Sequence, residues 1–125
     1  MKFKTIKLER TKGYFADGIN YKVKILSNGK VSFSGADFGQ EPQKLSWNID
    51  ANAIDELNKA IHQYGFFSIK KVKPTYFATD LSSCTTSVRM EDDSKRKTDN
   101  YHGDDSFPEE LNKLEDKIDK LIGIK

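Results

Sequence analysis

Cys84 is the only cysteine of this 125-residue chain and its strongest potential nucleophile. A cysteine nucleophile requires a thiolate stabilised by a nearby positive group and a base within hydrogen-bond reach. His62 and His102 are the candidate bases, and Asp80 is a candidate carboxylate to orient them. No catalytic motif surrounds Cys84, and a lone cysteine in a strand more often packs as a small apolar residue. We therefore predict an inert thiol and assign no catalytic residue.

A cluster of acids around His102 has the residue types that hold divalent cations. Asp104 and Asp105 follow the histidine closely, and Asp92 and Asp93 precede it. Hard cations need several oxygens at defined spacing, and neither an EF-hand loop nor a zinc pattern is present. Acids before a helix are also favourable without any metal, because the helix dipole attracts them. We predict a solvated loop, with no metal ligand and no cofactor.

Lysines beside aromatic residues occur at Lys70, Lys71 and Lys73, which precede Tyr76 and Phe77. Such pairs can bind single-stranded nucleic acid, with bases stacked on rings and ammonium groups on phosphates. Net charge is only +2, although the first 75 residues carry +6 and the last 50 carry −4. No RNA-binding signature accompanies the pattern. We expect most lysines to cover the solvated face of a sheet and nucleic acid to be an unlikely partner.

Thr79 and Asp80 form a short polar pair in the loop after Pro74. Asp80 can hold its own backbone turn or contact a ligand, and short polar side chains in loops more often hold turns. If a ligand or partner does bind near this loop, the candidate contacts are Tyr76, Asp80, Tyr101 and His102.

A β-hairpin is the clearest structural element. Residues 21–26 and 30–35 alternate apolar and polar side chains and meet at Ser27-Asn28-Gly29. A two-residue Asn-Gly loop would place the apolar sets of the two strands on opposite faces. A three-residue loop pairs Ile25 with Val31 and puts both sets on one face. We predict that loop, with its glycine in the left-handed conformation.

Further strands are predicted over residues 4–10, 45–49, 86–90 and 95–101, the last as a polar edge strand. A first helix begins at a cap, Asp50 or Asn52, and ends at Gly65. A second begins at a capping-box spacing from Ser106 to Glu109. This order predicts one α+β domain over residues 1–125: an antiparallel sheet of about five to six strands with two amphipathic helices on one face.

Each helix carries an apolar stripe at helical spacing. The first stripe is Ile54, Leu57, Ile61 and Tyr64, and the second is Leu111, Leu114, Ile118, Leu121 and Ile122. Glu115 is assigned to the solvent side with its charged neighbours. Because an isolated helix of this length is marginal in water, we expect the last helix to belong to the core.

The chain resembles a catalogued family of small bacterial domains of unknown function. The residues that carry the resemblance are Ile6-x-Leu8-x-Arg10, Tyr21, Ile25, Gly29-Lys30-Val31, Thr79-Asp80-Leu81, Tyr101-His102-Gly103, Pro108, Leu111, Leu114 and Ile118-Asp119. The family pattern usually has a cysteine pair just before the tyrosine, as Cys-Phe-Gly-x-Cys-Pro, and this chain has neither cysteine. The resemblance implies the fold and no activity.

The leading functional hypothesis is a non-catalytic binding domain that contacts a partner protein or ligand through its sheet face or the 70–83 loop. One alternative is a minor enzyme or redox-active protein that uses Cys84 or the His102 acidic loop. Another is a weak single-stranded nucleic-acid binder. No apolar run approaches the ~18 residues of a membrane span, and no signal segment is recognisable. A cytoplasmic location is expected, since a single cysteine also fits a reducing compartment.

Overall fold

The computed structural model describes residues 2–11, 20–36, 43–76 and 82–123. The sequence expectations for Phe77, Thr79 and Asp80 concern residues outside these ranges. Eight elements follow one another in the order β-β-β-β-α-β-β-α. They are β1 Phe3–Thr11, β2 Asn20–Leu26, β3 Lys30–Ala36, β4 Gln43–Asn48, α1 Ala51–Gln63, β5 Ser83–Met90, β6 Lys95–Tyr101 and α2 Glu109–Ile122. The predicted α+β class is confirmed.

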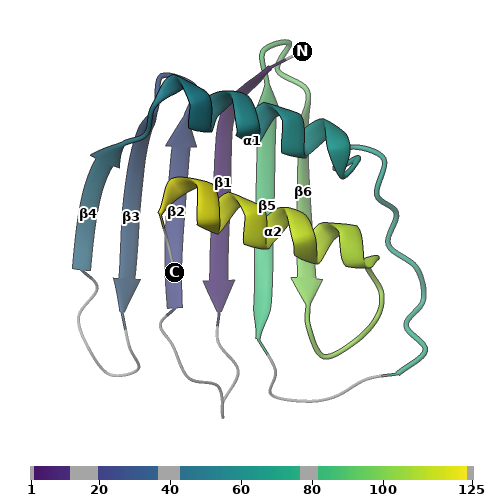
Figure 1. Cartoon of the computed structure of the whole chain (residues 1–125). Coiled ribbons are helices and arrows are strands. Elements are labelled where there is room, and N and C mark those ends of the chain that lie inside the picture. Colours follow the sequence, from purple (N-terminus) through teal and green to yellow (C-terminus); the bar gives the residue numbers. More distant parts are fainter. Residues whose placement is uncertain (1, 12–19, 37–42, 77–81, 124–125) are drawn as a thin grey trace.

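The strands form a single antiparallel sheet in the order β4-β3-β2-β1-β5-β6 (Figure 1). The first four strands are therefore a meander that begins in the middle of the sheet. The later hairpin, β5 and β6, adds to the free side of β1. This arrangement places the end of β1 beside the start of β5, which brings Arg10 opposite Cys84.

The predicted hairpin register is confirmed. Ile25 lies opposite Val31, and the amide of Gly29 donates to the carbonyl of Leu26 at 2.9 Å. Gly29 has φ +97°, in the left-handed region where a Cβ is unfavourable. A Cβ at this glycine would also lie 2.5 Å from the carbonyl oxygen of Ile49. The turn is thus packed against the chain that leads into α1.

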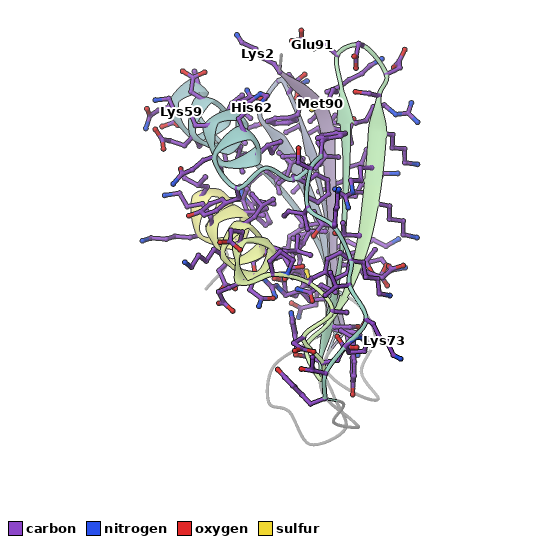
Figure 2. The ribbon with its side chains drawn as sticks, turned by 90° about the vertical axis from the view of Figure 1, so that its right-hand side faces the viewer. Lys2, Lys59, His62, Lys73, Met90 and Glu91 are labelled. Atoms are coloured by element: carbon purple, nitrogen blue, oxygen red, sulfur yellow. The ribbon has the colours of Figure 1, made fainter. Side chains whose placement is uncertain are left out.

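Both helices cover the same face of the sheet, and no described helix covers the other (Figures 1 and 2). Asp50 caps α1 by accepting from the amide of Ala53, and Gly65 follows its end at φ +63°. Asn58 of α1 accepts from the amide of Phe3 in β1 at 2.8 Å. At the other side of the sheet, the indole Nε1 of Trp47 donates to the carbonyl of Ile122 at 2.9 Å. These bonds fix where each helix lies on the sheet.

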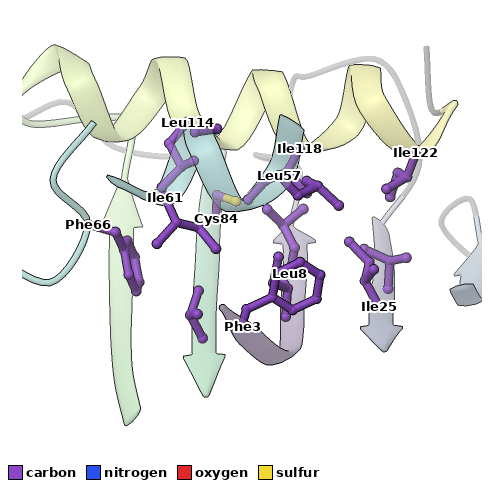
Figure 3. Close-up of a cluster of buried hydrophobic side chains, with 14 of the residues drawn as sticks. Phe3, Leu8, Ile25, Leu57, Ile61, Phe66, Cys84, Leu114, Ile118 and Ile122 are labelled. Atoms are coloured by element: carbon purple, nitrogen blue, oxygen red, sulfur yellow. The ribbon is translucent and has the colours of Figure 1, made fainter. Parts of the chain in front are cut away.

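The core fills the space between the helices and this inner face. Its strand residues are the predicted apolar sets, with Ile6, Leu8 and Val88 from the central strands all essentially inaccessible to solvent. Figure 3 shows Leu57 and Ile61 of α1 and Leu114, Ile118 and Ile122 of α2 gathered above this layer. The expectation that α2 belongs to the core is therefore consistent with its burial.

Two local expectations are wrong. The capping box does not form: α2 begins after Pro108, which makes no side-chain cap, and the Ser106 hydroxyl instead donates to Asp104 at 2.6 Å. Glu115 does not face solvent and is 1% exposed. None of the described helices is long and apolar enough to cross a membrane.

Candidate functional site

The uncovered face of the sheet, called the outer face below, carries a concentration of positive charge. Side chains from all six strands project from it away from the helices (Figure 2). Its cations are Lys7, Lys22, Lys24, Lys30, Lys44, Arg89, Lys95 and Lys97. Its acids are Glu9 and Asp99, and hydroxyl side chains fill many of the remaining positions. Within the described strands, this face therefore bears about three times the excess charge of the whole chain.

The strand registers align these side chains in rows across the sheet. One row, called the central row, runs from β6 to β4 through directly opposed residues. It consists of Lys97, Ser87, Lys7, Lys24, Ser32 and Ser46. With ~4.8 Å between neighbouring strands, the row is about 24 Å long. Ammonium and hydroxyl groups succeed one another along it without a carboxylate.

Lys7 and Lys24 are the centre of this row and form a directly opposed like-charged pair. Opposed like charges on neighbouring strands destabilise a sheet. Neither lysine has a carboxylate oxygen within 4 Å among the described residues. The fold thus retains a local repulsion that packing does not require.

The adjacent row contains the outer-face acids, and both have partners. Glu9 lies 3.8 Å from the ammonium group of its neighbour Lys22. Asp99 accepts from the hydroxyl of Thr85 at 2.8 Å. The positive and negative charges of this adjacent row largely cancel. The excess positive charge of the outer face therefore lies in the central row and in the row on its other side.

Two hollows follow from this arrangement. A broad one of about 740 Å³ spans the outer face and includes Lys7, Lys24 and Lys97 in its wall. A smaller one of about 200 Å³ adjoins it. Its wall consists of side chains from four strands, β1, β2, β5 and β6: Lys4, Thr5, Lys7, Lys24, Ser87, Arg89 and Lys95. Every residue around the smaller hollow is a cation or a hydroxyl, which is the chemistry that receives an anion.

A second polar group, buried beneath α2, contains the His102 that the sequence singled out. The carboxylate of Glu115 accepts from the Nδ2 of Asn100 at 3.1 Å. It also lies 3.4 Å from the Nε2 of His102, whose other ring nitrogen is 2.8 Å from the Ser82 hydroxyl. Asn100 further donates to Asn112 at 2.6 Å. Buried polar groups of this kind are costly unless paired, and here they are paired.

Arg10 extends this polar group toward the start of β2. Its Nε donates to Asp119 Oδ2 at 2.7 Å, and its Nη2 lies 3.3 Å from exposed Asp116. Burial raises the pKa of the Asp119 carboxyl, while the Arg10 guanidinium opposes that rise. Burial and the nearby Asp119 charge both raise the pKa of the Tyr21 phenol. Tyr21 is therefore neutral at physiological pH.

Cys84 lies on the inner face, fully buried between these groups. Burial raises the pKa of its thiol strongly, and the nearby Glu115 carboxylate adds to the effect. Its sulfur has the Thr86 hydroxyl 3.9 Å away, and the ring nitrogens of His102 lie against Ser82 and Glu115 instead. A neutral, solvent-excluded thiol is a poor nucleophile. His62 lies on α1 (Figure 2), and its side chain is exposed.

The four predicted contact residues are not joined into one pocket within the described chain. His102 belongs to the buried polar group, and Tyr101 ends β6 opposite Ser83. Tyr76 is 59% exposed, and Asp80 lies outside the described residues. They remain predictions. In the basic segment before Tyr76, Lys71 lies over the ring of Phe107, 5.9 Å from its centroid.

The acidic loop forms turns and helix-linked contacts. Asp104 accepts from the amide and hydroxyl of Ser106, and these bonds lower the pKa of its carboxyl. Asp105 accepts from the amide of Thr75 at 2.7 Å and from its hydroxyl, which ties the 70–76 segment to this loop. No group of three or more metal-ligating side chains occurs within the described residues.

A model of one protein family matches residues 4–122, from β1 to the last turn of α2. The chain belongs to the DUF6438 family, described as a domain of unknown function. The predicted resemblance to such a family is confirmed. No curated protein matches the chain. Membership of DUF6438 therefore assigns the chain to a domain family without a known activity.

Some residues of the two polar regions could be predicted from the sequence and others could not. Lys22 and Lys24 were expected on a solvated sheet face, but the alignment of Lys24 with Lys7 depends on pairing between strands. Glu115 was missed, although a signal existed: it lies four residues after Leu111 and three before Ile118, on the apolar stripe itself. An acid at such a position indicates a buried polar partner.

Proposed function

We propose that this DUF6438 domain is a non-catalytic binding module whose outer face receives an anionic partner. The observation that carries the proposal is the opposed pair Lys7 and Lys24 at the centre of an acid-free row. Like charges held together cost stability in the free protein. A bound anion relieves that repulsion. Anion binding would therefore account for the presence of two opposed lysines at this position.

Neighbouring features support the same function. The cations lie on a rigid sheet, and the rows are held by hydrogen-bonded strands on both sides of β1. A surface that is already ordered loses little entropy on binding. The buried thiol of Cys84 speaks against the enzyme alternative, because its raised pKa keeps it protonated. The proposal places the domain in the cytoplasm, where a free cysteine remains reduced.

Binding to heparin, a sulfated polysaccharide unrelated to any presumed partner, tests the proposal. The protein is titrated into labelled heparin at low salt, and the variant Lys7→Gln/Lys24→Gln is compared with it. The matched control is Lys113→Gln/Lys120→Gln, which removes the same charge from exposed positions of α2. We expect a loss of at least tenfold for the outer-face variant and less than threefold for the control. Absence of binding, or equal losses in both variants, would contradict the proposal.

A further inference from the structure

The donor types on the outer face distinguish among anionic partners. The central row combines ammonium groups with the hydroxyls of Ser87, Ser32 and Ser46. Phosphate oxygens in nucleic-acid complexes commonly accept from lysine and arginine and from the hydroxyls of serine and threonine. The wall of the small hollow repeats this combination: it contains five cations and the hydroxyls of Thr5 and Ser87.

A protein partner fits the outer face less well. Protein interfaces are depleted of lysine at their buried centres and enriched in aromatic residues. The centre of the outer face has the opposite composition, since Lys7 and Lys24 occupy it and the central row contains no aromatic side chain. The outer face can pair with negative charges along an extended partner without burying an apolar side chain of that partner.

The absence of aromatic rings from the central row and the small hollow also separates two forms of nucleic acid. A single strand gains much of its affinity from bases stacked on aromatic side chains. A duplex keeps its bases stacked internally and presents phosphates to its surroundings. The tyrosine and phenylalanine of β2 and β3, Tyr21 and Phe33, stack on each other with centroids 5.5 Å apart on the inner face. The central row and the small hollow therefore offer contacts to a backbone and no aromatic ring to exposed bases.

Building on the proposed function, we infer that the outer face binds the phosphate backbone of a nucleic-acid duplex. The backbone lies along the central row, and one phosphate occupies the small hollow bounded by Lys7, Lys24 and Arg89. A row about 24 Å long faces several successive phosphates, because each strand of a duplex presents one every ~3.4 Å along the axis. Base edges are not contacted, so binding is insensitive to sequence.

The test measures anisotropy of a labelled 20-base-pair DNA duplex between about 50 and 200 mM salt. Four phosphate contacts give a slope of log Kobs against log salt of about −3.6, which is a loss of roughly 100-fold over this range. Lys7→Gln/Lys24→Gln should make the slope shallower by about 1.8, and Lys113→Gln/Lys120→Gln should leave it unchanged. Two unrelated duplex sequences should bind alike. Urea unfolding of both variants checks folding, and the outer-face variant should be no less stable than the parent protein because it loses a repulsion.

Two comparison probes decide between sources of the anion. A single strand of the same length should bind more weakly than the duplex, and a polyglutamate peptide more weakly still. Tighter binding of the single strand or of polyglutamate overturns the duplex inference. Heparin binding that maps to the outer face, without measurable duplex binding, overturns it as well and leaves the proposed function standing. Failure of every polyanion overturns both.

Discussion

The guanidinium of Arg10 and the carboxylate of Asp119 meet at 2.7 Å, across 109 residues of sequence. Arg10 lies near the end of β1, one of the two central strands of the sheet, and Asp119 lies on α2, so this ion pair holds that helix to the middle of the fold. Side-chain exposure is 20% for Arg10 and 16% for Asp119. The pair is therefore only partly screened by solvent, and each partner depends on the other for compensation.

Arg10→Ala is expected to lower the free energy of unfolding by about 2–3 kcal/mol, because it leaves the Asp119 carboxylate buried without its cation. The matched control is Asp116→Asn, since Asp116 contacts the same arginine but has 80% of its side chain exposed. That change should cost less than about 0.5 kcal/mol. Urea unfolding measures both, and equal effects would contradict the importance of the buried pair.

Glu115→Ala is expected to destabilise the domain by about 2 kcal/mol or more. The substitution opens a cavity and leaves part of the Asn100 amide without its acceptor. Glu110→Ala is the control, because Glu110 occupies an exposed position on the same helix. Thermal and urea unfolding should separate the two variants clearly. A Glu115→Ala variant as stable as the control would show that the buried carboxylate is dispensable.

Cys84 should react with an alkylating reagent more slowly than a free model thiol in the folded protein at pH 8. Burial and the raised pKa keep the thiol protonated and out of reach. The same reaction in urea supplies the control, since unfolding exposes the thiol and should restore the model rate. Labelling faster than the model thiol would indicate an activated thiolate and favour the enzyme alternative.

Stability should fall at alkaline pH. Folding raises the pKa values of both the Cys84 thiol and the Tyr21 phenol. Above the ~8.5 of an unfolded thiol, the unfolded state releases a proton that the folded state retains, so the free energy of unfolding decreases as pH rises. Each such group contributes a slope of up to about 1.4 kcal/mol per pH unit. Urea unfolding between pH 7 and 10 should show a shallower decline for Cys84→Ala than for the parent, and an identical decline would contradict the assignment.

Gly29→Ala should destabilise the domain by about 1–3 kcal/mol. The residue has φ +97°, and an added Cβ would meet the carbonyl oxygen of Ile49. Gly65→Ala is the comparison, because Gly65 is also left-handed at φ +63° but has no atom within 4 Å of the added Cβ among the described residues. Its cost should be the smaller of the two. The difference in unfolding free energy reports the contact with Ile49 together with the less favourable backbone angle of Gly29, and equal costs in the two variants would contradict both.

Local pattern predicted the elements because each depends on neighbouring residues. The parity of residues around Gly29 determined a hairpin register, and the cap at Asp50 and the edge strand Lys95–Tyr101 were also confirmed. The strand order was beyond such reasoning. Nothing in the sequence near Leu8 specifies that it lies between Val23 and Thr86, since that pairing joins segments distant in the chain.

The candidate sites show the same division. The lysines of β2 were expected to face solvent, and they do so at Lys22 and Lys24. The acid-free central row could not be predicted, because it exists only when six strands are aligned. The capping box failed for a local reason: Ser106 has a closer acceptor in Asp104, and its hydroxyl is used there.

The position of β1 has a consequence for the order in which the chain can fold. Among the described strands, β1 comes earliest in the sequence, and it pairs on both sides, with β2 soon after it and with β5 some seventy residues later. Until β5 has been synthesised, the backbone N–H and C=O groups on one edge of β1 are unpaired and can hydrogen-bond to a strand of another chain. The meander of β1 to β4 must also wait for α2 before much of its inner face is covered. Such long-range closure slows folding and exposes intermediates to aggregation, so a newly made chain is most vulnerable until its last helix has docked.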